Sequence, residues 1–79
     1  MKITIGEYCQ FSVQARVQLL HSFGQYICFT IIERKGIILF KLFDFYVEVI
    51  KDLYNHTILQ ANPIPCNSMI TFYKKISFF

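Results

Sequence analysis

The sequence is poor in the patterns that most often mark a catalytic or phosphate-binding site. Its three glycines stand alone in the chain, so no glycine-rich loop is present to hold a phosphate. It has only five acidic residues, and they do not form the paired carboxylates typical of acid–base catalysis. No cysteine has a partnered base in its local sequence. We therefore expect a protein that is not an enzyme and that needs no cofactor.

Cysteine and histidine are also too few and too widely spaced to indicate a metal site. Such sites are usually marked by close pairs such as C-x-x-C. None of the five candidates forms such a pair: Cys9, His21, Cys28, His56 and Cys66. On one helix, His21 and Cys28 would share a side but lie too far apart along the axis to hold an ion without other ligands. An enzyme would have only these two residues and Glu48 to use.

The chain also lacks the features of an exported or membrane-spanning protein. It has no signal peptide with a basic start and an apolar core, and its cysteines are odd in number. These features predict reduced thiols in a cytoplasmic protein. The longest uncharged window, 17–32, is interrupted by polar residues and falls short of the ~18 to 20 apolar residues that a span requires. We expect no transmembrane helix.

Apolar residues, in contrast, are abundant. Of 79 residues, 54% are hydrophobic and 18% are aromatic, while 16% are charged. One helix can cover only one face of a small sheet, and monomers rarely leave large apolar patches in water. The composition therefore predicts a homodimer or another protein partner. The net charge of +3 leaves a nucleic-acid-binding regulator as the alternative, although no dense basic stripe is present; its contacts would be Lys41, Lys51, Lys74 and Lys75.

The densest apolar run, Ile37 to Ile50, predicts two strands joined at Phe43 and Asp44. This register sets apolar residues opposite each other on one face: Leu42 with Phe45, Phe40 with Val47 and Ile38 with Val49. The other face is mixed: Lys41 with Tyr46, Leu39 with Glu48 and Ile37 with Ile50. A slip of one residue would bury two charges, so the pattern specifies the register. An unbroken strand or a buried helix stays an alternative, because no Asn-Gly or Asp-Gly turn is present.

A helix is predicted before the hairpin, beginning at an N-cap on Ser12 and ending near Cys28. Its apolar arc contains Val13, Val17, Leu20 and Phe23, which should pack on the apolar hairpin face. Arg16 falls within this arc, so we expect its stem to pack and its head to reach solvent. The β-branched run in 29–33 favours an extended segment, although the helix could also continue through it. Residues 34–36 are then the turn into the hairpin, and Lys2 to Ile5 read as a short edge strand or a loose arm.

After the hairpin, Thr57 to Ala61 is predicted as a third antiparallel strand, with Leu59 and Ala61 facing inward. Pro63 and Pro65 should end regular pairing. We therefore divide the chain into a domain over 1–62 and an apolar C-terminal extension over 63–79. The extension is rich in aromatic residues, and it should add a strand to its own subunit or a neighbour, or lie in a hydrophobic groove.

Together these elements predict an α+β fold, with one N-terminal amphipathic helix packed on an antiparallel sheet of three to four strands. The sheet edges, the half-polar hairpin face and the extension are the surfaces expected to contact a partner. Glu48 lies on that face, where a covering partner would bury it. The predicted interface residues are Ile37, Leu39, Tyr46, Glu48, Ile50, Phe72 and Tyr73.

Two segments also carry a resemblance. The end of the predicted helix, Leu19-Leu20-His21-Ser22-Phe23-Gly24-Gln25-Tyr26, and the strand Phe45-Tyr46-Val47-Glu48-Val49 make the chain similar to a group of small bacterial proteins of unknown function. Members of that group resemble one another as one helix followed by a three-stranded antiparallel meander. The likeness covers about residues 11–61. It implies a fold but no activity, cofactor or site.

Overall fold

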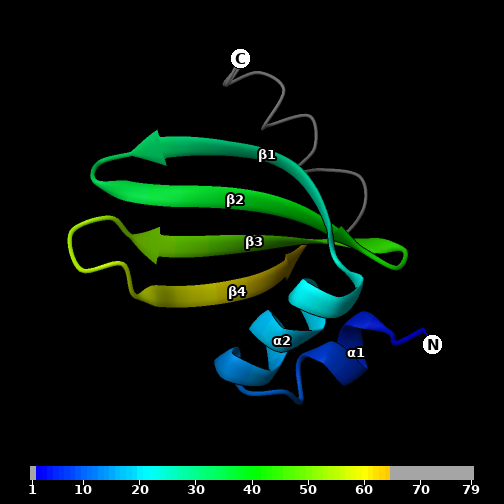
Figure 1. Cartoon of the computed structure of the whole chain (residues 1–79). Helices are drawn as coiled ribbons and strands as arrows, with labels where there is room; N and C mark the ends of the chain where they lie inside the picture. The colour runs from blue at the N-terminus through cyan, green and yellow to red at the C-terminus, as the bar shows by residue number, and fades with distance from the viewer. Residues whose placement is uncertain (1, 65–79) are drawn as a thin grey trace.

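The computed structural model describes residues 2–64, which form two helices and a four-stranded sheet (Figure 1). All neighbouring strands are antiparallel, and their order in the sheet is β1-β2-β3-β4. The α+β class and the antiparallel sheet are confirmed. The elements are α1 (Ile5–Tyr8), α2 (Val13–Phe23), β1 (Gln25–Ile32), β2 (Lys35–Leu42), β3 (Phe45–Asp52) and β4 (Ile58–Ile64).

The central hairpin is confirmed in both position and register. β2 and β3 pair Leu42 with Phe45 and Ile38 with Val49, and Leu39 lies opposite Glu48. Phe43 adopts a positive φ of 57° in the two-residue connection, a conformation that asparagine or glycine usually supplies, so this turn forms without the common Asn-Gly signal. The two-residue period was enough to specify the pairing, because any other register would have exchanged the two faces.

The predicted helix begins where expected, but it is not the first helix of the chain, it is shorter than predicted and it lacks the predicted amphipathic character. The shorter α1 precedes it, and α2 ends at Phe23 rather than near Cys28. Ser12 is the N-cap, as predicted, and its Oγ accepts a hydrogen bond from the backbone N–H of Ala15 at 3.2 Å. Of the α2 residues, only Leu20 is buried, while Phe23 is 47% exposed.

Gly24 ends α2 because the chain turns there into β1 with an extended backbone, at φ −74° and ψ 147°. A Cβ at Gly24 would lie 2.6 Å from the carbonyl oxygen of Leu20, so this close exit requires glycine. The segment that was predicted to be extended from residue 29 therefore begins earlier, at Gln25, and forms an eight-residue strand. The following turn is centred on Glu33 and Arg34, both at positive φ, as in a type I′ turn, so residues 35 and 36 belong to β2 and not to the turn.

The predicted strand at Lys2 to Ile5 was also wrong, because a capping box starts α1 there. The Oγ1 of Thr4 accepts from the backbone N–H of Glu7 at 3.1 Å. In return, the Oε1 of Glu7 accepts from the backbone N–H of Thr4 at 2.8 Å. These two hydrogen bonds satisfy two donors that a helix N-terminus otherwise leaves unpaired, and they favour a helical turn over a strand.

The last strand differs from the prediction at both ends. β4 covers Ile58–Ile64, and Ala61 is buried, as expected, but Leu59 is exposed. A register shift opposite Ile50 and Lys51 leaves Leu59 without a direct partner, which explains its exposure. Pro63 pairs with Val47 and does not end the ladder, since an edge strand can lack one backbone donor. Pro65 and the rest of the C-terminal extension lie outside the described residues, and the boundary at residue 62 stays a prediction.

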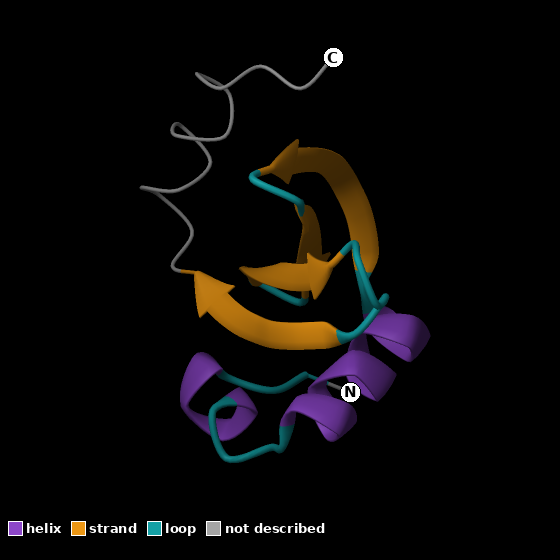
Figure 2. Ribbon diagram, turned by 90° about the vertical axis from the view of Figure 1, so that its left-hand side faces the viewer, coloured by secondary structure: helices purple, strands orange, loops and turns teal. Residues whose placement is uncertain are grey.

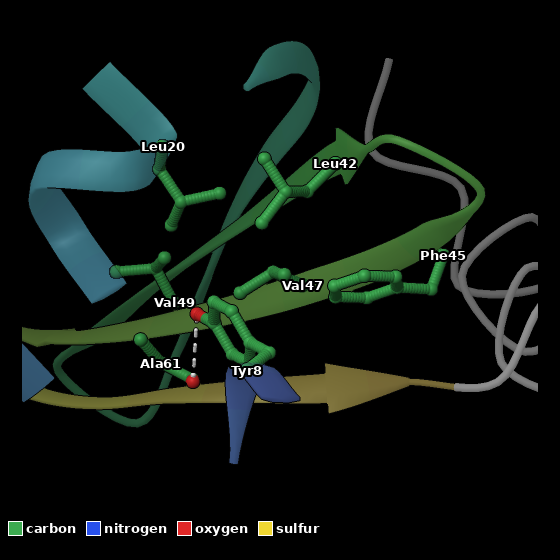
Figure 3. Packing of buried hydrophobic residues seen from close by; sticks show 7 residues of the cluster. All are labelled: Tyr8, Leu20, Leu42, Phe45, Val47, Val49 and Ala61. Atoms are coloured by element: carbon green, nitrogen blue, oxygen red, sulfur yellow. Dashed lines mark hydrogen bonds between the residues drawn. The ribbon is translucent and has the colours of Figure 1, made fainter. Parts of the chain in front are cut away.

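The main core lies between the helices and the face of the sheet that we call the helical face, and Figure 3 shows its buried side chains. This is the hairpin face that was expected to receive a helix. Tyr8 of α1, which was not predicted to be buried, is completely covered and packs edge-on against Phe45 at 5.5 Å between ring centroids. Both helices lie on the same side of the sheet, beside β4 (Figure 2). The buried residues of this cluster are Tyr8, Leu20, Leu42, Phe45, Val47, Val49 and Ala61.

Candidate functional site

The edge of β1 is the least protected part of the sheet. β2 is its one neighbour within residues 2–64. β1 is eight residues long, has the sequence QYICFTII and contains neither a charged residue nor a proline. Its large apolar side chains are exposed, with Tyr26 and Ile31 each at 59%. Natural proteins usually protect edge strands with charge, proline, a short length, a bulge or a cover. Within the described part of the chain, β1 has only the bulge, a register shift between Tyr26 and Cys28.

The edge of β4 is protected in two ways. Pro63 removes one backbone donor from this strand. In addition, the carbonyl oxygen of Ala61 accepts two hydrogen bonds, one from the hydroxyl of Tyr8 and one from the Nη1 of Arg16, each at 3.1 Å. Figure 3 shows the bond between Tyr8 and Ala61. This part of β4 therefore has its acceptor satisfied and is covered by α1 and α2.

Arg16 connects the segments that produce this cover. Its Nε donates to the carbonyl of Phe11 at 2.9 Å, and its Nη2 donates to the carbonyl of Cys9 at 3.1 Å. Its guanidinium also lies 5.0 Å from the centre of the Tyr8 ring. Arg16 was expected to reach solvent, but it binds three backbone carbonyls instead. Its planar group with several fixed donors suits this task, which a lysine could not perform.

Tyr8 is held in this cluster in its neutral form. Burial raises the pKa of its hydroxyl to about 12, although the neighbouring guanidinium of Arg16 acts in the opposite direction. A neutral hydroxyl can donate to the carbonyl of Ala61, whereas a phenolate has no proton to donate. The proton on Tyr8 is therefore part of what holds α1 against β4.

The hairpin face predicted as an interface is partly covered by the chain itself. Leu39 is 1% exposed and forms a second buried cluster with Cys28 and Ile64 on this face, which we call the opposite face. Ile37 and Tyr46 pack against that cluster. Glu48 and Ile50 are half-buried, and Phe72 and Tyr73 lie outside the described residues. The structure thus leaves less of this face available to a partner than an open sheet would.

The residues considered for catalysis are not brought together. His21 is exposed on α2, on the helical face, while Cys28 is buried on the opposite face. Leu39 separates Cys28 from Glu48 in the strand register. Burial raises the pKa of the Cys28 thiol, which is the reverse of what activates a cysteine nucleophile. Within residues 2–64, no group of three histidine, cysteine or acidic side chains could hold a metal ion.

The two described lysines of the nucleic-acid alternative also lie apart. Lys41 is paired with Tyr46 on the opposite face, whereas Lys51 has the parity of Val47 and Val49 on the helical face. The lysines are also at opposite ends of the hairpin. Lys74 and Lys75 lie outside the described residues. The sheet therefore does not place Lys41 and Lys51 on one nucleic-acid-binding surface.

The chain matches no family model, no curated protein and no solved structure. The resemblance to small bacterial proteins therefore stays a prediction. Neither of the two described helices is long and apolar enough to cross a membrane.

Sequence reasoning missed β1 as the site because it assigned half of this strand to the helix. One signal was present: the window without charge, from Val17 to Ile32, contains all of β1. A strand without charge that lies at a sheet edge is exceptional. The edge position, however, appears only once the strand order is known.

Proposed function

We propose that the protein is a non-enzymatic interaction module that forms a homodimer through the edge of β1. The observation that carries this proposal is the uncharged, proline-free β1 edge with its exposed apolar side chains. The predicted dimer had two possible surfaces, the sheet edges and the half-polar hairpin face. The covered Leu39 disfavours the face, and the covered Ala61 carbonyl disfavours the β4 edge.

A second copy of β1 is a suitable partner for this strand. Two β1 strands related by a twofold axis run antiparallel, and the backbone of each presents the same row of donors and acceptors to the other. Addition of a strand to an exposed edge obtains its affinity from these main-chain hydrogen bonds and from side chains on both faces. Because β1 contains no charged residue, the pairing places no like charges opposite each other within the strands.

The expected dimer is weak to moderate. An edge of eight residues falls at the small end of specific interfaces, which bury about 1,200 Å² or more. We therefore expect a dissociation constant in the micromolar range. The cytoplasmic location and the absence of enzymatic activity remain part of the proposal.

The test is the molar mass measured by light scattering after gel filtration, over roughly 1 to 100 µM protein. The wild-type chain should approach the mass of a dimer at the highest concentration. Ile31→Lys, on β1, should weaken dimerisation on the order of tenfold or more, because each new ammonium group would have to lie against the uncharged, largely apolar strand of the partner.

The matched control is Leu59→Lys, which places the same charge on the other edge strand at a side chain that is 42% exposed. It should leave the mass unchanged at each concentration. A wild-type chain that stays monomeric throughout would refute self-association. A dimer disrupted by Leu59→Lys but not by Ile31→Lys would instead place the interface away from β1.

A further inference from the structure

We propose that α2 and the sheet form a binding site for an uncharged, largely apolar small molecule. A cleft of about 340 Å³ lies between them on the helical face and is open at one side. This site does not rest on the self-association proposed above. The cleft is lined by Val17, Leu20, His21 and Gly24 from the helical segment and by Tyr26, Ile38, Phe40, Val49 and Ile58 from the four strands.

The cleft exists because α2 covers only part of the helical face. α2 contacts β4 and β2, and Leu20 is its one buried residue. The exit at Gly24 then takes the chain directly into β1, where Tyr26 packs edge-on against Phe40 at 6.2 Å between ring centroids. The last turn of α2 therefore forms one wall, and the Tyr26 and Phe40 rings lie at the strand side.

The size and lining of this cleft are typical of a small-molecule site. Such sites usually have volumes of about 300 to 1,000 Å³, mostly apolar walls and a few polar groups that orient the ligand. Here seven of the nine lining residues are apolar or glycine, and His21 and Tyr26 supply the polar groups. Both side chains can donate or accept a hydrogen bond.

The charges around the cleft select the class of ligand. None of its lining residues is acidic, lysine or arginine. A charged ligand would therefore lose its water without gaining an opposite charge. An anion would in addition meet the C-terminal end of α2, where the helix dipole is negative. The fitting ligand is a neutral aromatic or alicyclic molecule that carries one hydroxyl or carbonyl group for His21 or Tyr26.

The experiment uses the full chain and 1-aminoanthracene, a neutral aromatic compound whose fluorescence rises in apolar sites. We expect saturable binding at one site per chain. 2-Naphthol, which is neutral at pH 7, should displace the dye on the order of tenfold more effectively than 2-naphthoate, which is an anion of similar size. Binding that does not saturate, or equal displacement by both competitors, would overturn the proposal.

Two neighbouring residues of β4 locate the site. Ile58 lines the cleft and is 36% exposed, whereas Leu59 does not line it and is 42% exposed. Ile58→Phe should fill the cleft and weaken dye binding on the order of tenfold, while Leu59→Phe should change it less than about twofold. If Ile58→Phe loses its native circular dichroism, Val17→Phe takes its place. This variant fills the cleft from the helix and should weaken dye binding in the same way.

A fourth variant separates this site from the proposed dimer. Ile31→Lys should leave dye affinity unchanged, because Ile31 lies on β1 outside the cleft. Loss of binding in Ile31→Lys, with no loss in either cleft-filling variant, would place the dye at the β1 edge and overturn the site. If the wild-type chain proves to be monomeric, the expected dye binding and its dependence on the cleft-filling variants stay the same.

Discussion

β1 and β4 each have one hydrogen-bonded neighbour within residues 2–64, but only β4 is covered by side chains from elsewhere in the described chain. β4 contains a proline, and its Ala61 carbonyl binds both Tyr8 and Arg16. β1 contains no charge or proline, and five of its large apolar residues are exposed. The two edges of this small sheet are thus protected to different degrees, mainly because Tyr8 and Arg16 of the N-terminal segment cover β4.

This difference suggests separate roles for the two edges. The covered edge is where the N-terminal helices are attached, so changes there should alter the stability of the fold. The uncovered edge strand has one buried residue, Cys28, whereas β4 has two, so changes to the exposed side chains of β1 should alter association while leaving the fold stable. Three further experiments test this division at the covered edge.

The largest effect is expected for Tyr8→Ala. The Tyr8 side chain is completely buried and packs against Phe45, so its removal leaves a large cavity between α1 and the sheet. Truncation of a buried aromatic side chain costs about 3 to 5 kcal/mol of unfolding free energy. Urea denaturation followed by circular dichroism measures this loss. Tyr54→Ala, at a side chain that is 88% exposed, is the control and should stay within about 0.5 kcal/mol of the wild type.

A smaller loss is expected for Arg16→Ala, which removes the three hydrogen bonds to the carbonyls of Phe11, Cys9 and Ala61. We expect about 1.5 to 3 kcal/mol, because hydrogen bonds from a charged group lie in this range and these contacts are only partly buried. Arg16→Lys should restore less than half of the loss, since an ammonium group cannot reproduce the planar guanidinium.

The control for Arg16 is Lys2→Ala. Its ion pair with Asp44, at 3.1 Å, is mostly exposed and should contribute less than about 1 kcal/mol. If Arg16→Ala were as mild as Lys2→Ala, the cover of β4 would not depend on Arg16, and the contrast between the edges would rest on Tyr8 and Pro63 alone.

The smallest effect at neutral pH is expected for Tyr8→Phe, which removes only the hydroxyl. Arg16 still donates to the Ala61 carbonyl, so the loss should be about 1 kcal/mol. The pH dependence is more informative. The pKa of Tyr8 is about 12 in the folded protein and 10.0 without the effect of burial, so its contribution to stability is complete below pH 10 and falls as the pH rises toward 12.

The stability advantage of the wild type over Tyr8→Phe should therefore shrink between pH 10 and pH 12. Denaturation curves of both proteins at pH 8, 10 and 11.5 measure it, and the comparison removes the other groups that titrate in this range. A constant difference would show that Tyr8 does not titrate with a raised pKa, and that its proton does not hold α1 against β4.

The accuracy of the sequence prediction varied with how local the deciding interactions were. The hairpin over Ile37 to Ile50 was predicted pair by pair, because alternation of apolar and polar residues is a property of the strand itself. The boundary of α2 was wrong because Phe23 and Ile27 continue the apolar period of the helix past its end. At Gly24 the sheet prevailed over this period, since residues from 25 onward pair with β2, interrupted by one register shift between Tyr26 and Cys28.

The candidate site was harder to predict than the fold. The absence of charge in β1 can be read from the sequence, but the prediction assigned part of this strand to the preceding helix. The cover of β4 could not be read from the sequence, because Tyr8 and Ala61 are 53 residues apart and meet only in the folded chain. The neutral lining of the cleft likewise comes from five separate elements together with Gly24.

By itself, then, the sequence determined the α+β class, the N-cap at Ser12 and the register of the central hairpin. These features depend on neighbouring residues or on a strand period, which a linear pattern records. The tertiary structure alone decided where α2 ends, which strands lie at the edges and which edge is covered. Those features depend on contacts between distant segments, and the free energy of such contacts overrides local preference wherever the two disagree.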